Sequence, residues 1–483
     1  MNEAIRRMWM VAVAFVMVLL VAGSTIQVVL ADQLKGDPLN RRQIYLEYGA
    51  PRGPILVDGE PIAESVESDG RFAYLRQYPD SPVYAPITGM YSLNYGASGL
   101  EQKLNKHLSG TPASAFMDRA LEIVTGSTAQ GDQVELTLDG DIQRLVHGAL
   151  PDGVRGSIVV TEVETGRIVG MASRPTFDAN AVSSPDLTES RAAMEALEAT
   201  PGGSAYTNRA TQQLVSPGST FKLIDAVAML ESGDYAPDEE LEVPDRYTLP
   251  GTTTQLGNYR GEGAQCGTRS KATLTWIVAN SCNTPFAQAA VELGQDEIRE
   301  VAERFGFNQD FEVPLDVAAS RFPQDLDDAA LAQSSIGQRD VQATALQMNM
   351  VASGIANGGM LMEPQLVESI RRSDLSVVES FSPRERGRVT SEDVAAQVRD
   401  MMVAVVEEGS GSGARSSQVQ IAAKTGTAQI DGTDAVHSWI TGFAPAENPR
   451  YAVTIVVENT DLGTGRRLTV DNMKRIMEAV VAE

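Results

Sequence analysis

Residues that bind transition metals are scarce in this sequence. It has two cysteines, Cys266 and Cys282, and three histidines, His107, His147 and His437. None of the histidines stands at a spacing from the cysteines that is typical of zinc ligands. The sequence therefore predicts no metal site, and no motif in it indicates a cofactor.

Positive charge is also in short supply. The 483 residues include 39 Lys and Arg against 64 Asp and Glu, which gives a net charge of −25 and a pI near 4.6. Such a chain repels a phosphate backbone, so nucleic acid is not expected as a partner. Lysine is the rarer cation, present only at Lys35, Lys103, Lys106, Lys222, Lys271, Lys424 and Lys474.

Only one long hydrophobic run is present, at residues 8–30, and it follows Arg6 and Arg7. It is uncharged and long enough to span the roughly 30 Å hydrocarbon core of a bilayer. Because the positive end stays in the cytoplasm, residues 1–30 are predicted to be a cytoplasmic tip and single-pass anchor in the cell membrane, with the rest outside the cytoplasm. A cleaved signal peptide is the alternative, since the small residues 22–24 offer a cutting site.

The two cysteines fit an exported protein. In an oxidising compartment Cys266 and Cys282 are close enough in sequence to form a disulfide. That bond would hold the loop at residues 263–268 beside residues 281–283. The alternative is two independent buried thiols, because geometry decides whether a bond forms.

Two of the rare lysines fall in short strings with chemical meaning. Ser219 and Lys222 stand three residues apart, so on a helix both side chains lie on one face and an amine there can take the proton of a nucleophilic hydroxyl. Lys222 is the candidate base. It must be neutral near pH 7, which requires burial or a neighbouring cation, and Lys424 is the candidate neighbour.

The other strings complete the constellation. Ser281 is a candidate proton relay, and Asn283 is a candidate ligand of a substrate amide. Residues 421–429 are predicted to be an edge strand, so a peptide substrate can pair with it beside Lys424 and Thr425. Gly426 allows the substrate backbone to approach closely.

In their order along the chain these strings match S-x-x-K, S-x-N and K-T-G, the signature of penicillin-binding proteins and serine β-lactamases. The resemblance to class B penicillin-binding proteins extends well beyond the three strings. N-R-A and P-G-S-T-F-K (residues 208–210 and 217–222), S-I-G-Q (335–338) and K-T-G-T-A (424–428) resemble that class, as do segments of the N-terminal part near residues 51–59 and 99–110. The lack of an insert after Val367 makes the chain most similar to the short actinobacterial penicillin-binding protein A group.

The resemblance implies a fold and an activity. The expected fold is α+β: a penicillin-binding, serine β-lactamase-like transpeptidase domain, with an antiparallel sheet flanked by helices, at residues 140–483. A pedestal, or dimerisation-like, module at residues 31–139 precedes it. The expected activity is peptidoglycan D,D-transpeptidation through a Ser219 acyl-enzyme. Thr427 is expected to supply a backbone N–H to the oxyanion hole, and its hydroxyl and that of Thr425 are expected to bind the substrate carboxylate.

The implied ligands are peptidoglycan stem peptides ending in D-Ala-D-Ala, and β-lactam antibiotics. The implied partners are a SEDS-type membrane glycosyltransferase and other division or elongation proteins. Three alternatives stay open: a D,D-carboxypeptidase or β-lactamase-like hydrolase that uses the same residues with water, a β-lactam sensor, and a non-catalytic scaffold.

The local patterns indicate several elements of this fold. Residues 139–150 are predicted to be a helix that Asp139 caps. Residues 156–163 and 167–173 are predicted to be an antiparallel hairpin, and residues 472–482 a closing amphipathic helix.

Overall fold

The computed structural model describes residues 2–30, 48–109, 130–200, 205–259, 265–311 and 313–482. Parts of the predicted N-terminal module (31–47 and 110–129) and of the predicted 263–268 loop (263 and 264) lie outside these ranges. The first element is α1 (Asn2–Ser24), followed by a π-helical turn, η1 (Thr25–Val29). Within them Ile5–Gln27 is long and apolar enough to cross a membrane, with a mean hydropathy of 2.3.

A six-stranded sheet forms the core of the N-terminal part, in the order β15-β14-β6-β1-β2-β3. Four of its strands precede residue 140, namely β1 (Ile55–Val57), β2 (Glu60–Glu67), β3 (Tyr74–Gln77) and β6 (Gln133–Leu136). The other two, β14 (Val367–Arg371) and β15 (Val377–Ser380), come from much later in the chain, and β14 pairs antiparallel with β6. The sheet is therefore assembled from both halves of the sequence.

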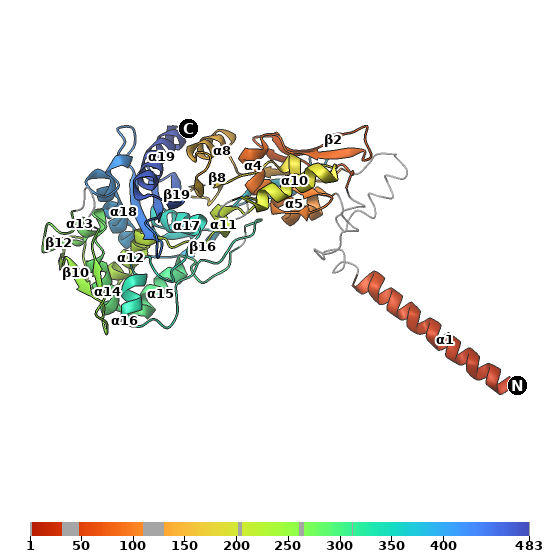
Figure 1. Cartoon of the computed structure of the whole chain (residues 1–483), viewed down its shortest axis with the longest axis horizontal. Coiled ribbons are helices and arrows are strands. Elements are labelled where there is room, and N and C mark those ends of the chain that lie inside the picture. The colour runs from red at the N-terminus through yellow and green to blue at the C-terminus, as the bar shows by residue number, and fades with distance from the viewer. Residues whose placement is uncertain are drawn as a thin grey trace.

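The remaining elements of this part are short: α4 (Ser81–Thr88), β4 (Tyr91–Ser92), β5 (Gly96–Ala97), α5 (Gly99–Lys103) and α6 (Asn105–Leu108). A buried ionic cluster ties them to the sheet, because the fully buried Glu101 carboxylate accepts hydrogen bonds from Arg52 at 2.8 Å and from Arg76 at 2.5 Å. Two helices from later in the chain also lie beside this part. One is α9 (Ala179–Ser183), which contacts β3 and β4, and the other is α10 (Leu187–Glu198), which lies near α4 and α5 in Figure 1.

The second sheet has five antiparallel strands in the order β17-β18-β19-β7-β8. They are β7 (Arg155–Glu162), β8 (Ile168–Arg174), β17 (Ala422–Gln429), β18 (Val436–Ala444) and β19 (Tyr451–Thr460). This arrangement confirms the predicted β7–β8 hairpin and the predicted edge position of β17. The sheet separates two hydrophobic clusters, because alternate residues of each strand face opposite sides. In β19, Val453 and Ile455 belong to one cluster and Ala452 and Val456 to the other.

Two helices cover one face of this sheet, α8 (Gly140–Ala149) and α19 (Leu462–Ala482). The predicted cap of α8 is confirmed, since Asp139 Oδ1 accepts the backbone N–H groups of Asp141 and Ile142, both at 2.9 Å. The closing helix α19 begins ten residues earlier than Asn472, the predicted start. Its first turn is held by Asp461 Oδ1, which accepts the N–H of Thr464 at 2.9 Å.

The opposite face carries a lobe made mostly of helices (Figure 1). Its helices are α11 (Arg209–Gln212), η2 (Gly218–Thr220), α12 (Lys222–Ser232), α13 (Leu274–Ala279), α14 (Thr284–Leu293), α15 (Gln295–Arg304), α16 (Asp328–Ser334), α17 (Ala345–Ala356) and α18 (Glu392–Glu407). The short turn η3 (Ser412–Ala414) packs on the other face instead, because Ala414 belongs to the cluster covered by α8 and α19. Three small ribbons accompany them: β9 (Glu240–Glu242) with β12 (Lys271–Thr273), β10 (Arg246–Thr248) with β11 (Gln255–Gly257), and β13 (Met360–Met362) with β16 (Glu385–Arg388). The α+β architecture, a sheet with flanking helices, is as expected.

Candidate active site

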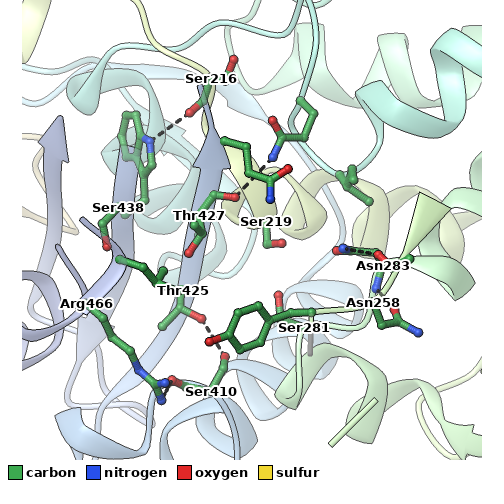
Figure 2. A pocket seen from close by; sticks show the side chains of 18 of the residues that line it. Ser216, Ser219, Asn258, Ser281, Asn283, Ser410, Thr425, Thr427, Ser438 and Arg466 are labelled. Carbon is green, nitrogen blue, oxygen red and sulfur yellow. Dashed lines mark hydrogen bonds between the residues drawn. The ribbon is translucent and has the colours of Figure 1, made fainter. Parts of the chain in front are cut away.

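A cavity of about 700 Å³ opens where the edge strand β17 meets this helical lobe. Residues from all three sequence strings line it, among them Ser219, Ser281, Asn283 and Thr425. Figure 2 shows Ser219 and Ser281 between the strand residues on one side and Asn283 with Asn258 on the other. The structure thus brings together side chains that are far apart in the sequence.

Ser219 occupies the 3-10 turn η2 at the start of the nucleophile helix α12. Two glycines make this turn possible. Gly218 has a φ of +54°, and its N–H donates to Gly337 O at 2.9 Å. A Cβ on Gly337 would lie 2.0 Å from Gly218 O, so only glycine fits there. The S-I-G-Q segment therefore contacts the nucleophile turn directly.

Lys222 lies fully buried one turn after Ser219. Its Nζ atom donates to Ser281 O at 2.9 Å, to Cys282 O at 3.0 Å and to Asn283 Oδ1 at 2.7 Å. Burial, and secondarily the charge of Lys424, holds the pKa of Lys222 well below its ordinary value. Both conditions that the sequence analysis names for a neutral amine, burial and a neighbouring cation, are present here.

Lys424 is the second buried amine, on β17. Its Nζ donates to Ser281 Oγ at 2.7 Å and to Thr425 O at 2.9 Å. Burial lowers the pKa of Lys424 to about 7. Ser281 therefore bridges the two lysines, with its carbonyl on Lys222 and its hydroxyl on Lys424. It does so in a left-handed conformation, with a φ of +58°, which is unfavourable for a residue other than glycine.

The predicted disulfide is present between Cys266 and Cys282, with the two Cα atoms 5.5 Å apart. Asn258 provides a second connection to the same turn. The Asn258 Oδ1 atom accepts the backbone N–H of Asn283 at 2.6 Å and that of Thr284 at 3.1 Å. The loop beside the cavity is thus joined to the 281–283 turn both covalently and by hydrogen bonds.

The strand side of the cavity is formed by Thr425, Gly426 and Thr427. Thr425 Oγ1 lies 2.6 Å from Ser410 Oγ. A Cβ on Gly426 would stand 2.7 Å from Pro217 O, so glycine lets β17 approach the nucleophile turn. Thr427 is exposed to the cavity, and its carbonyl accepts from Gln338 Nε2 at 3.4 Å.

Three residues that line this cavity had no signal in the sequence: Asn258, Ser410 and Arg466. Ser410 stands in a short Gly and Ser stretch, which indicates only a loop. Asn258 and Arg466 belong to no motif, and only long-range packing brings them here. In the ranges that the structure describes, no group of three or more His, Cys, Asp or Glu side chains is placed to hold a metal ion.

Comparison with known proteins gives the class of protein. Residues 156–478 match the penicillin binding protein transpeptidase domain, and residues 52–134 match the penicillin binding protein A dimerisation domain. The chain therefore belongs to the class B penicillin-binding protein transpeptidases, which confirms the resemblance found in the sequence.

Individual relatives agree with this assignment. The peptidoglycan D,D-transpeptidase PbpA of Mycolicibacterium smegmatis is 40% identical over 469 residues, covering 95% of this chain and 94% of the relative. PbpA of Mycobacterium tuberculosis is 38% identical over 468 residues, again covering 95% and 94%. The crystal structure of PBPA from M. tuberculosis superposes with a TM-score of 0.85 at 36% identity, covering 90% of this chain and all 100% of the solved chain.

Proposed function

We propose that this protein is a peptidoglycan D,D-transpeptidase that cross-links stem peptides through an acyl-enzyme on Ser219. The observation that carries the proposal is the contact of Lys222 with the 281–283 turn. This contact holds a buried amine of lowered pKa one turn after Ser219. Among the serines that line the cavity in the described residues, Ser219 alone begins an S-x-x-K string. The PbpA relatives bear the same activity in their names.

The reaction follows from the chemistry of the proposed groups. Ser219 Oγ attacks the carbonyl carbon of the penultimate D-alanine, and Lys222 accepts the hydroxyl proton. The oxyanion is held by the backbone N–H groups of Ser219 and Thr427, a device commonly worth about 3 kcal/mol per donor. The C–N bond breaks as Ser281, supported by Lys424, passes a proton to the leaving D-alanine. An amine of a second stem then attacks the acyl carbon and gives its proton to Ser281, while Lys222 returns the first proton to Ser219 Oγ as the bond between the acyl carbon and that oxygen breaks.

The remaining pocket groups bind the substrate in this proposal. Asn283 binds a substrate amide, and Thr425 and Thr427 bind the terminal carboxylate. Gly426 lets the peptide pair with the free edge of β17. β-Lactams enter as mimics of the same peptide and stall as acyl-enzymes. Structures of penicillin-binding protein A from M. tuberculosis include acyl-enzyme complexes with imipenem and with penicillin G.

The cellular setting is part of the proposal. The apolar helix Ile5–Gln27 would anchor the chain in the membrane with the cavity outside the cytoplasm. The module at residues 31–139 would act as a pedestal for the catalytic domain at residues 140–483. A SEDS-type glycosyltransferase and other division or elongation proteins are the proposed partners, since a cross-linking enzyme needs new glycan strands beside it.

Labelling with a fluorescent penicillin tests the central step. We expect one adduct, on Ser219, and no adduct in Ser219→Ala at an unchanged melting temperature. Ser216→Ala is the matched control, because Ser216 lines the same cavity but has no lysine three residues later. An adduct mapped to another serine would refute the assignment. An assay with a D-amino acid acceptor then separates transfer from hydrolysis.

A further inference from the structure

A hairpin of the six-stranded sheet ends in exposed apolar side chains. The hairpin joins β14 to β15, and we refer to residues 371–378 as the hairpin tip. Leu375 is 62% exposed, Val377 57% and Val378 39%. The described residues after 30 include seven large apolar side chains that are exposed, and three of them lie in this tip. Exposed apolar side chains that gather at one place mark a surface that binds a lipid or a protein.

Two guanidinium groups flank these side chains. Arg371 ends β14, Arg372 begins the turn, and both are exposed. Among the described residues no carboxylate forms an ion pair with either of them. The turn itself is well formed, since the N–H of Leu375 donates to Arg372 O at 2.8 Å and Asp374 Oδ1 accepts the N–H of Ser376 at 2.8 Å. Both guanidinium groups therefore keep donors for an anionic ligand, and their planar fork matches a phosphate.

The register of the sheet shows which way this hairpin points. Ile55 of β1 and Ile370 of β14 both pair with Val134 of β6, so the three residues lie at one level. β6 ends toward the five-stranded sheet, because the N–H of Asp139 that follows it donates to Val169 O of β8 at 3.0 Å. β14 is antiparallel to β6, so it ends on the other side, away from the five-stranded sheet.

The hairpin tip therefore lies at the end of the sheet where the chain enters from the apolar helix. β1 is parallel to β6 and begins at this end, and the helix Ile5–Gln27 precedes β1 in the chain. The ring centroid of Tyr48, which also precedes β1, lies 4.6 Å from that of Phe72 in the turn between β2 and β3. β2 is antiparallel to β1, so this turn is at the same end.

The shape of β15 favours a lipid surface over an added strand. β15 is a short edge strand, and a bulge at Val378 interrupts it between the pair Ile370 with Glu379 and the pair Arg371 with Val377. Short, bulged edges resist pairing with another chain. The contact surface of the tip is then made by side chains. Apolar side chains next to arginines suit a bilayer, because the first enter the acyl region and the second bind lipid phosphates.

We propose that the hairpin tip rests on the surface of the membrane that holds the anchor. Leu375 and Val377 enter the boundary between the headgroups and the acyl chains, and Arg371 and Arg372 bind lipid phosphates. Anionic lipids strengthen this contact, whereas the net charge of −25 repels the rest of the chain from them. The inference goes beyond the proposed reaction and rests only on the proposed membrane anchor. It gives the six-stranded sheet a second contact with the bilayer, which fixes its tilt.

Quenching of tryptophan fluorescence in lipid nanodiscs tests the proposal with the full-length chain. Trp9→Phe, which removes the tryptophan of α1 and leaves Trp276 and Trp439, is the parent. Leu375→Trp is added to it, in discs of phosphatidylcholine and phosphatidylglycerol. We expect the added tryptophan to emit at shorter wavelength than in an unfolded chain and to lose intensity when the lipids are brominated near the headgroup. The parent should lose none.

Leu187→Trp in the same parent is the matched control. Leu187 is a leucine of similar exposure, 52%, but it begins α10, which packs with α9 beside β3 at the opposite edge of the sheet. It should not be quenched. Replacing Arg371 and Arg372 by glutamine should weaken the quenching of Leu375→Trp, and more so in discs with phosphatidylglycerol than in discs of phosphatidylcholine alone. Melting temperature and penicillin labelling check that each variant is folded.

Three results would each overturn the inference: no quenching of Leu375→Trp, equal quenching of Leu375→Trp and Leu187→Trp, or quenching that does not depend on the two arginines. A tip that binds a protein instead gives the first result, because the discs hold this chain alone. Quenching of Trp9 in the wild-type chain reports the anchor separately. Its absence would refute the anchor and this inference together, whereas labelling of Ser219 tests the proposed reaction independently of both.

Discussion

The disulfide holds the turn that supports the candidate base, so its removal should affect catalysis as well as stability. Cys282 stands between Ser281 and Asn283, and all three residues accept hydrogen bonds from Lys222. The bond fixes this turn to Cys266, 16 residues earlier. We choose the double variant Cys266→Ala, Cys282→Ala as the perturbation, because both sulfurs are buried and alanine adds no buried hydroxyl.

The size of the effect follows from the length of the closed loop. In the chain-entropy model a loop of this length is worth about 3 kcal/mol. For a domain of the size matched by residues 156–478, that loss lowers the melting temperature by about 4 °C. The Asn258 hydrogen bonds to Asn283 and Thr284 remain in the variant. The turn should therefore loosen without unfolding, and acylation should slow several-fold without being abolished.

Three measurements check this reasoning: thermal unfolding, the rate of penicillin acylation, and intact mass after alkylation. Dithiothreitol should lower the melting temperature and the acylation rate of the wild-type protein, and it should change neither in the double variant. Two alkylated thiols in wild-type protein exported under oxidising conditions would refute the bond. A lower melting temperature with an unchanged acylation rate would refute the link between the disulfide and the base.

Four further variants test other parts of the protein. Lys222→Arg should remove acylation almost entirely, because a guanidinium cannot act as a base. Lys424→Arg should retain measurable acylation, and it should keep its charge above pH 7, where the pKa of about 7 leaves Lys424 neutral. Acylation rates measured as a function of pH test both variants. Asp225 is buried without a hydrogen-bond partner in the described residues, and burial raises its pKa well above the ordinary value. The folded state therefore keeps a proton that the unfolded chain releases. As a result, the stability of the folded state falls as pH rises above about 4. Asp225→Asn should therefore stabilise the protein more at pH 8 than at pH 5 in urea unfolding, and a gain that does not depend on pH would refute this. Gly426→Ala should cost about 1 to 3 kcal/mol and slow acylation, because its Cβ would lie 3.0 Å from Thr220 N; an unchanged melting temperature would contradict that.

The chemistry of this protein was easier to predict than its long-range packing. Ser219, Lys222 and Lys424 could be singled out from the sequence because they stand in three short motifs, and the structure brings these motifs together around Ser281. Local signals also placed the cap at Asp139 and the edge strand that carries Lys424. The cap and the strand depend on residues that are close to them in the sequence, so they can be predicted from a single sequence.

The features that the sequence did not reveal depend on distant contacts. The early start of α19 runs against the local pattern, because Gly463 and Gly465 disfavour a helix. In the structure Gly465 packs so tightly that a Cβ there would lie 2.6 Å from the Cβ of Ser438. Asn258 and Arg466 are ordinary polar residues in sequence, and only the assembled cavity gives them partners. The pairing of β14 with β6 is likewise invisible to any local pattern.

The pairing of β14 with β6 affects the order in which the chain folds. As the chain is synthesised, β6 emerges early, but the strand that covers its edge, β14, follows only after most of the helical lobe. Until then the N-terminal sheet has an open edge, which can pair with another chain. The non-local contact is also slow to form. A factor that shields nascent strands should therefore raise the yield of this protein, and a fragment that ends before residue 367 should aggregate.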